Sequence, residues 1–154
     1  MAQTPESKLA QLQITLPVVP PAIGSYVDLT RVGNLAFLSG KGPRQANGEY
    51  IKGKVGSDLT IEQGYAAARL TAINQIAVLK KELGDLKKVK RIVKVNGFVN
   101  SAGTFYDQPK VMNGFSDLLI EVFGDAGKHA RTSIGTASLP MNMAIEVEMI
   151  VEVE

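Results

Sequence analysis

Two charged side chains near the C-terminus could act together on a small anionic molecule. Arg131 lies at the start of a predicted strand, Ala130–Ser138, and Glu146 lies at the start of the last one. In that last strand apolar residues alternate with Glu146, Glu148, Glu152 and Glu154, so the acids share the face opposite the core. A guanidinium is the best geometric partner of a carboxylate, and a nearby acid can move protons. We therefore predict a site for a small carboxylate on neighbouring strands; a surface ion pair at Arg131 and a solvated acidic face are the competing interpretations.

Composition limits the other kinds of site. The chain has 154 residues, 45% of them hydrophobic, and a formal net charge of +2, which suits one globular domain without a strong electrostatic field. It has no Cys, which excludes disulfides and thiolate chemistry, and its single His excludes a multi-His metal site within one chain. We expect no metal and no cofactor. No leader and no apolar run long enough to span a bilayer is evident, so a cytoplasmic protein without a membrane partner is expected.

The elements that must position Arg131 and Glu146 alternate between helix and strand. Apolar periodicity and caps predict a long helix between Thr60 and Gly84 and a second one between Asp107 and Gly124. A short leading helix (Thr4–Leu12) and strands at Tyr26–Val32, Leu35–Gly40 and Val89–Asn100 complete the order with the two tail strands. This order predicts an α+β fold, a mixed sheet with two helices packed on one face. The other face, with polar and small residues, should be covered by another subunit.

Two further features carry less weight. Lysines and arginines cluster between Lys80 and Lys94 but lack interleaved aromatic residues for base stacking, so a solvated helix end is the favoured interpretation and nucleic acid is not an expected partner. His129 could be a general base, but a surface or interface role is more typical of a single His beside a strand.

Several segments together resemble one known family. They are Ala22-Ile23-Gly24-Ser25-Tyr26, Asn34-Leu35-Ala36-Phe37-Leu38-Ser39-Gly40, Asn113, Ala130-Arg131-Thr132-Ser133, and Leu139-Pro140 through Ile145-Glu146-Val147-Glu148. The chain resembles the Rid family, also called the YjgF or L-PSP endoribonuclease family. The match runs from about Pro21 to the C-terminus, which predicts an N-terminal extension over residues 1–20 and a single Rid-like domain over residues 21–154.

The resemblance implies a chorismate-mutase-like α+β fold and a homotrimer, with a barrel-like core and clefts between subunits. It also implies hydrolysis of reactive enamines and imines of 2-amino acids to 2-oxo acids and ammonia. Arg131 would hold the substrate carboxylate, and Glu146 would handle protons or position water. The cleft would be lined by Tyr26, Gly40, Asn113, Thr132 and Ser133.

The chain also departs from the family pattern at three positions. Ser133 stands where Cys is common, Lys41 where Gln is common, and Gly135 where a bulkier residue is usual, which indicates a divergent subgroup. Two other functions therefore stay open: an L-PSP-type endoribonuclease that inhibits translation, and a trimeric small-carboxylate-binding protein without turnover.

Overall fold

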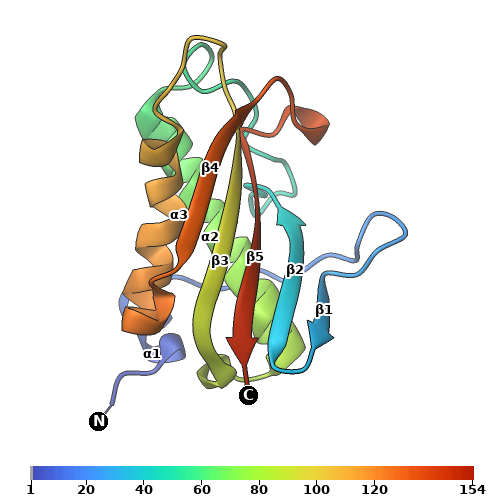
Figure 1. Ribbon diagram of the computed structural model, residues 1–154, viewed down its shortest axis with the longest axis vertical. Coiled ribbons are helices and arrows are strands. Elements are labelled where there is room, and N and C mark those ends of the chain that lie inside the picture. Colours follow the sequence, from blue (N-terminus) through green and yellow to red (C-terminus); the bar gives the residue numbers. More distant parts are fainter. Residues whose placement is uncertain (1) are drawn as a thin grey trace.

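The computed structural model describes residues 2–154 as one α+β unit with three helices and five strands (Figure 1). The helices are α1 (Pro5–Gln11), α2 (Ile61–Leu83) and α3 (Gln108–Phe123). The strands are β1 (Leu29–Val32), β2 (Leu35–Lys41), β3 (Val89–Asn100), β4 (Ala130–Thr136) and β5 (Ile145–Val153). Short 3-10 turns η1 (Leu86–Lys88), η2 (Gly124–Gly127) and η3 (Pro140–Asn142) join them. The predicted single mixed α+β domain is confirmed.

The five strands form one sheet in the order β1-β2-β5-β3-β4. Strands β3 and β4 are parallel, and the other neighbours are antiparallel, so the sheet is mixed as predicted. Helix α3 supplies the crossover that two parallel strands require. One part of the sequence prediction is wrong: β4 is not a neighbour of β5, because the long strand β3 lies between them.

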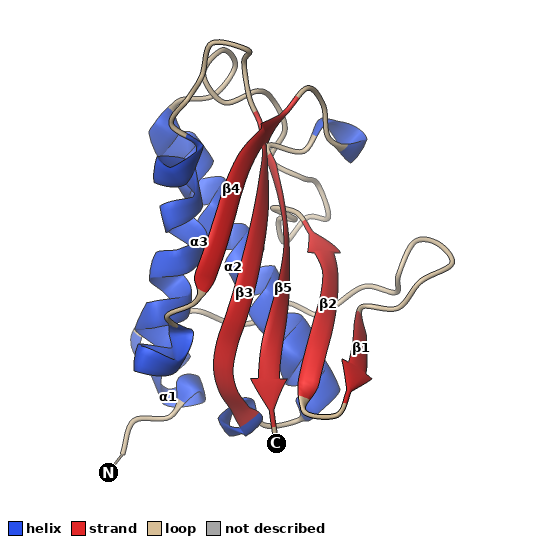
Figure 2. Ribbon diagram, in the orientation of Figure 1, coloured by secondary structure: helices blue, strands red, loops and turns tan. Residues whose placement is uncertain are grey.

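Helices α2 and α3 cover one face of the sheet and leave the other face open (Figure 2). Helix α2 begins with the predicted capping box of Thr60 and Gln63 and ends at Gly84. Its inner side is rich in alanine, which lets it approach α3 and the sheet closely. Leu79 and Phe115 are among the fully buried side chains between the layers.

Two strands are shorter than the sequence predicts. The first begins at Leu29 rather than Tyr26, because residues 22–27 leave the sheet in an extended loop on its β1 side (Figure 1). Strand β4 ends at Thr136 rather than Ser138, and the carbonyl of Ala137 accepts a hydrogen bond from Lys54 Nζ instead of continuing the ladder.

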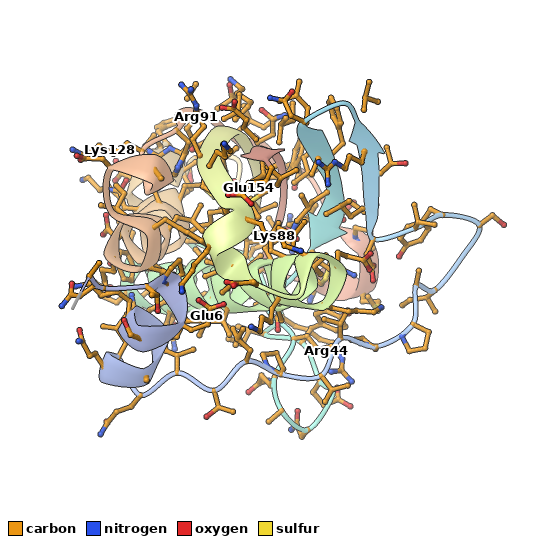
Figure 3. All side chains as sticks on the ribbon, turned by 90° about the horizontal axis from the view of Figure 1, so that it is seen from below. Glu6, Arg44, Lys88, Arg91, Lys128 and Glu154 are labelled. Atoms are coloured by element: carbon orange, nitrogen blue, oxygen red, sulfur yellow. The ribbon has the colours of Figure 1, made fainter. Side chains whose placement is uncertain are left out.

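The N-terminal segment packs on the same core as the rest of the chain. Leu9 of α1 is buried in the main hydrophobic cluster. Glu6 extends from α1 toward η1 and the end of α2 (Figure 3). Its Oε1 accepts hydrogen bonds from the backbone N–H of Leu86, at 2.8 Å, and from Lys80 Nζ, at 3.1 Å. Residues 1–20, predicted to be an extension, therefore include a helix that is fastened to the domain.

The open face of the sheet is more apolar than the sequence suggested. Register places Phe37, Phe98, Ile134 and Ile150 on this face together with the acids of β5. Phe37 is 40% exposed and Ile134 is 46% exposed. Large apolar side chains gathered on an uncovered sheet face are typical of a surface that a partner covers.

The closest helix contact generates a stability prediction. A Cβ added at Gly114 would lie 2.1 Å from the carbonyl oxygen of Tyr65, so Gly114→Ala must push α3 away from α2. Overpacking of this kind costs about 1–3 kcal/mol. We expect a lower free energy of unfolding in urea for Gly114→Ala. Gly103→Ala is the matched control, since nothing lies within 4 Å of its added Cβ; equal stability of the two variants would contradict this account of the contact.

Candidate active site in two halves

Glu146 lines an open cleft with a volume of about 480 Å³ beside β2 and the loop before β1. Tyr26 and Gly40, both predicted to line the site, lie in the same cleft. The side chain of Glu146 is half-buried, and Tyr26 is 48% exposed at the cleft edge. The structure thus brings together three of the seven predicted site residues, all from one side of the molecule.

A bulge in β2 makes room for Glu146. Leu38 pairs with Met149 and Lys41 pairs with Val147, so β2 carries one extra residue between these pairs. A Cβ added at Gly40 would lie 2.6 Å from Oε1 of Glu146, which explains why glycine stands beside this carboxylate. Bulges often redirect a side chain next to a functional site.

A buried glutamine, missed by the sequence analysis, stabilises this bulge. Gln75 of α2 is fully buried, and its Nε2 donates to the carbonyls of Ser39, at 3.0 Å, and Val147, at 2.8 Å. Without this amide those oxygens would be buried at the bulge with fewer partners. Gln75 falls on the same side of α2 as Ala68, Ala72 and Leu79, and an amide in this apolar row was the signal that could have revealed it.

The surroundings of Glu146 favour its protonated form. Burial raises the pKa of the Glu146 carboxyl above its ordinary value, and the negative charge of Glu148 on the same face raises it further. A carboxyl group whose pKa moves toward neutrality is suited to proton transfer.

Two cations also border the Glu146 cleft. Lys41 forms an ion pair with the buried Asp28, with Nζ 2.6 Å from Oδ1, so this departure from the family pattern is neutralised within the chain. Arg44, missed by the sequence analysis, is half-buried in the cleft wall and forms no ion pair with any carboxylate of residues 2–154.

Arg131 lies in a separate cleft of about 390 Å³ between β4 and α3. Its Nη1 donates to Oδ1 of Asn113, at 2.9 Å, and to Oγ of Ser116, at 3.1 Å. Its Nη2 donates to the carbonyl of Pro109 at 3.4 Å. The predicted pair Arg131 and Asn113 is thus in direct contact, and the structure adds Ser116 and His129 to the lining.

The guanidinium of Arg131 keeps two donors available. The bonds described above use the two Nη1 hydrogens and one Nη2 hydrogen, and within the described chain the Nε–H and the other Nη2–H are not used. Burial lowers the pKa of Arg131, with Asp117 acting in the opposite direction, yet residues 2–154 contribute no ion pair to it. A partly buried cation with two unused donors matches a carboxylate.

Arg131 and Glu146 face opposite sides of the sheet. Arg131 is in register with Val95 and Met149, on the helix-covered face, whereas Glu146 is in register with Phe98 and thus with Ile134, on the open face. Their Cα atoms are separated by three residues along the strands and by two strand spacings, or about 14 Å. One copy of the chain therefore holds the two predicted catalytic residues in separate clefts, the candidate half-sites, and does not unite them.

Thr132 and Ser133 also lie on opposite faces of the sheet. The hydroxyl of Thr132 lies on the open face, where it accepts a hydrogen bond from Lys94 Nζ at 3.2 Å, and so it does not join Arg131. Ser133 shares the face of Arg131, and its buried Oγ has no hydrogen-bond partner among residues 2–154. At Gly135, a Cβ would lie 2.6 Å from Oγ of Ser101, so close packing explains this glycine.

Within residues 2–154, no group of three or more His, Cys, Asp or Glu side chains is arranged to hold a metal ion. In the same part of the chain, no helix combines the length and apolarity needed to cross a membrane.

The sequence and the fold are those of one family. The model of the family described as "YjgF/chorismate mutase-like, putative endoribonuclease" matches residues 6–153. The chain belongs to this family, which confirms the resemblance to Rid (YjgF, L-PSP) proteins. The match also extends across most of the segment predicted to be an N-terminal extension.

Individual relatives agree with this assignment. Protein TCP17 of Trypanosoma cruzi is 41% identical over 95% of this chain and 92% of its own length. A 2-iminobutanoate/2-iminopropanoate deaminase of Dermatophagoides farinae is 30% identical over 92% of this chain and 95% of its own length. The solved structure of Atu1372 from Agrobacterium tumefaciens is 41% identical, covers 97% of this chain and 92% of that one, and has a TM-score of 0.89.

A more distant structure bears on ligands. Escherichia coli TdcF with bound serine is 24% identical, covers 91% of this chain and 96% of that one, and has a TM-score of 0.65, so the two proteins share the fold. At least one structure with this fold therefore holds a small amino acid.

The environment of Glu146 generates a titration prediction. Glu148→Gln removes the second cause of the raised pKa and should lower the midpoint at which the Glu146 carboxyl carbon titrates in ¹³C NMR spectra. Burial remains, so the midpoint should stay above the ordinary value. Because the folded protein binds this proton more tightly than the unfolded chain, stability should fall as the pH rises through the interval between the ordinary and the raised pKa.

The controls for this titration lie on the same strand. Glu152→Gln should leave the midpoint unchanged, since Glu152 is engaged with Arg91 and Asn34. Glu146→Gln should remove both the titration and the loss of stability over that pH interval. Identical midpoints in Glu148→Gln and wild type would refute the electrostatic part of the argument.

Proposed function

We propose that this protein hydrolyses reactive enamine and imine intermediates of 2-amino acids to 2-oxo acids and ammonia. The observation that carries the proposal is the Arg131 guanidinium, a partly buried cation with two unused donors and without an ion pair among the described residues. Imino acids of this class carry one carboxylate next to the reacting carbon. The deaminase relative at 30% identity supports the same reaction.

The hydrolysis requires that the substrate be held in place and that one side chain transfer protons. An enamine first takes up a proton on its C3 carbon, and its nitrogen gives one up, which yields the imine. Water then adds to the electrophilic carbon of the C=N bond and gives up one proton while the nitrogen takes up one, which gives a carbinolamine. The C–N bond then breaks, ammonia leaves with a further proton, and the hydroxyl loses its proton as the C=O bond of the 2-oxo acid forms. Glu146, with its raised pKa, would carry these protons, and Arg131 would fix the carboxylate.

The proposal includes a homotrimer with its clefts between subunits. Two observations support association: the half-sites of one chain lie on opposite faces of its sheet, and the open face carries Phe37, Phe98, Ile134 and Ile150. In such an assembly the Glu146 cleft of one copy would meet the Arg131 cleft of the next. The small carboxylate would be held between them.

Carboxylate binding can be tested with 2-oxobutanoate, a stable product analogue, by isothermal titration calorimetry. Arg131→Ala should raise the Kd about 10- to 150-fold, since charge-assisted hydrogen bonds contribute about 1.5–3 kcal/mol. Arg131→Lys should restore binding only in part, because it lacks the planar fork. Arg44→Ala is the matched control and should bind nearly as wild type; loss of binding in Arg44→Ala alone would instead assign the carboxylate to the Glu146 cleft.

Turnover can be tested with 2-aminoacrylate or 2-iminobutanoate generated in situ by a dehydratase, followed through semicarbazone formation. Wild type should accelerate loss of the imine, and Glu146→Gln should lower the rate at least tenfold because the proton carrier is lost. Glu152→Gln should keep the wild-type rate. A wild-type rate equal to the buffer blank, with binding intact, would favour the non-catalytic binding protein, and RNA cleavage that disappears in Glu146→Gln would favour the endoribonuclease.

Assembly can be measured independently by sedimentation equilibrium. The wild type should sediment as a trimer at micromolar concentration. Phe37→Asp should shift the distribution toward monomer, because it puts a charge on the open apolar face, whereas Tyr106→Asp, at a residue 80% exposed outside the sheet, should not. A wild-type protein that is monomeric throughout would contradict the shared cleft.

A further inference from the structure

Two side chains behind Arg131 form a short hydrogen-bonded chain to the backbone. Oγ of Ser116, in the middle of α3, lies 3.1 Å from Nη1 of Arg131 and 2.9 Å from Nε2 of His129. Nδ1 of His129 lies 2.6 Å from the carbonyl oxygen of Gly127. The three side chains line the same cleft.

The direction of each hydrogen bond follows from the groups themselves. The carbonyl of Gly127 can only accept, so Nδ1 of His129 carries a hydrogen. In a neutral imidazole Nε2 then accepts, and the hydroxyl of Ser116 must donate to it. The Ser116 oxygen keeps its lone pairs for the hydrogen that Arg131 Nη1 donates.

Both ends of this hydrogen-bonded chain are held by close packing. Ser116 is only 8% exposed on α3. Gly127 is pressed against α3, since a Cβ there would lie 2.2 Å from the carbonyl oxygen of Leu119. Its carbonyl is therefore a fixed anchor for the imidazole, and the imidazole fixes the Ser116 hydroxyl.

We propose that Ser116 and His129 are positioning residues for Arg131. They hold both Nη1 hydrogens on the protein side, with Asn113, so that the Nε–H and Nη2–H edge faces the cleft in the orientation that accepts a substrate carboxylate. This inference rests on the proposed function, because it assigns a role within that binding site. Neither residue touches the substrate in this arrangement.

The electrostatic surroundings keep His129 neutral. Burial lowers the pKa of His129, the positive charge of Arg131 lowers it further, and the bond to Gly127 opposes both. Two other charged side chains line this cleft. Asp117 accepts a hydrogen bond from the Tyr65 hydroxyl at 2.7 Å and keeps the negative charge that acts on Arg131, and Lys128 pairs with Asp125 at 2.7 Å. A carboxylate bound to Arg131 would offset its charge, so the pKa of His129 should rise when ligand binds.

Nuclear magnetic resonance can test the hydrogen-bonded chain without any ligand. His129 is the only His of the chain, so its imidazole signals need no assignment. Long-range ¹H–¹⁵N spectra of wild type near neutral pH should show the Nδ1–H tautomer, and added 2-oxobutanoate should raise the titration midpoint. An Nε2–H tautomer in the wild type would overturn the proposal.

Binding and kinetics test the positioning role itself. Ser116→Ala and His129→Leu should raise the Kd for 2-oxobutanoate and the KM about 3- to 10-fold with little change in kcat, because the carboxylate is bound equally in ground and transition states. His129→Gln should restore affinity, since its amide can accept from Ser116. Unchanged Kd and KM in a folded Ser116→Ala protein, or a loss of kcat with KM unchanged, would overturn the proposal.

The outcomes separate this inference from the proposed function. Tight binding and turnover by wild type together with wild-type constants in Ser116→Ala would refute the positioning role alone. No binding of 2-oxobutanoate by wild type would refute the proposed function and the positioning role together. A thermal melting curve of each variant identifies any protein that fails to fold.

Discussion

The place of β3 between β4 and β5 is the constraint on which the site depends. This strand order separates Arg131 and Glu146 by two strand spacings. Because directly paired residues of adjacent strands point to the same face, the register of β4 and β5 on β3 sends Arg131 toward α3 and Glu146 to the open face. No rotamer of either side chain crosses a close-packed sheet. The two residues are therefore divided between the faces, and under the proposed function a complete site would combine surfaces from two copies.

Each half-site has its own local support. Near Glu146 the extra residue of β2 bends the strand, Gly40 leaves room for the carboxylate, and Gln75 satisfies the carbonyls at the bulge. Near Arg131 the support comes from side chains of α3 and from the turn before β4. In both halves a buried polar group holds the backbone or side chain that presents the charge, as pre-organised sites require.

The charged groups of Arg131 and Glu146 also lower the free energy of unfolding of a single copy of the chain. Arg131 is partly buried without an ion pair among residues 2–154, and the pKa of Glu146 is raised by burial and by Glu148. Such arrangements reduce stability and persist at sites where binding or catalysis uses them.

Local patterns in the sequence were sufficient to predict most of the helices and strands and the chemical groups of the candidate site. The period of apolar residues and the caps at Thr60 and Gly84 predicted α2, and strict alternation predicted β5, because both signals lie within a few residues. Strand order is not local: it depends on how α3 packs, so the sequence placed Arg131 and Glu146 on neighbouring strands and the fold did not. Gln75 and Ser116 acquire their partners only through contacts between distant segments, and tertiary packing alone decided their roles.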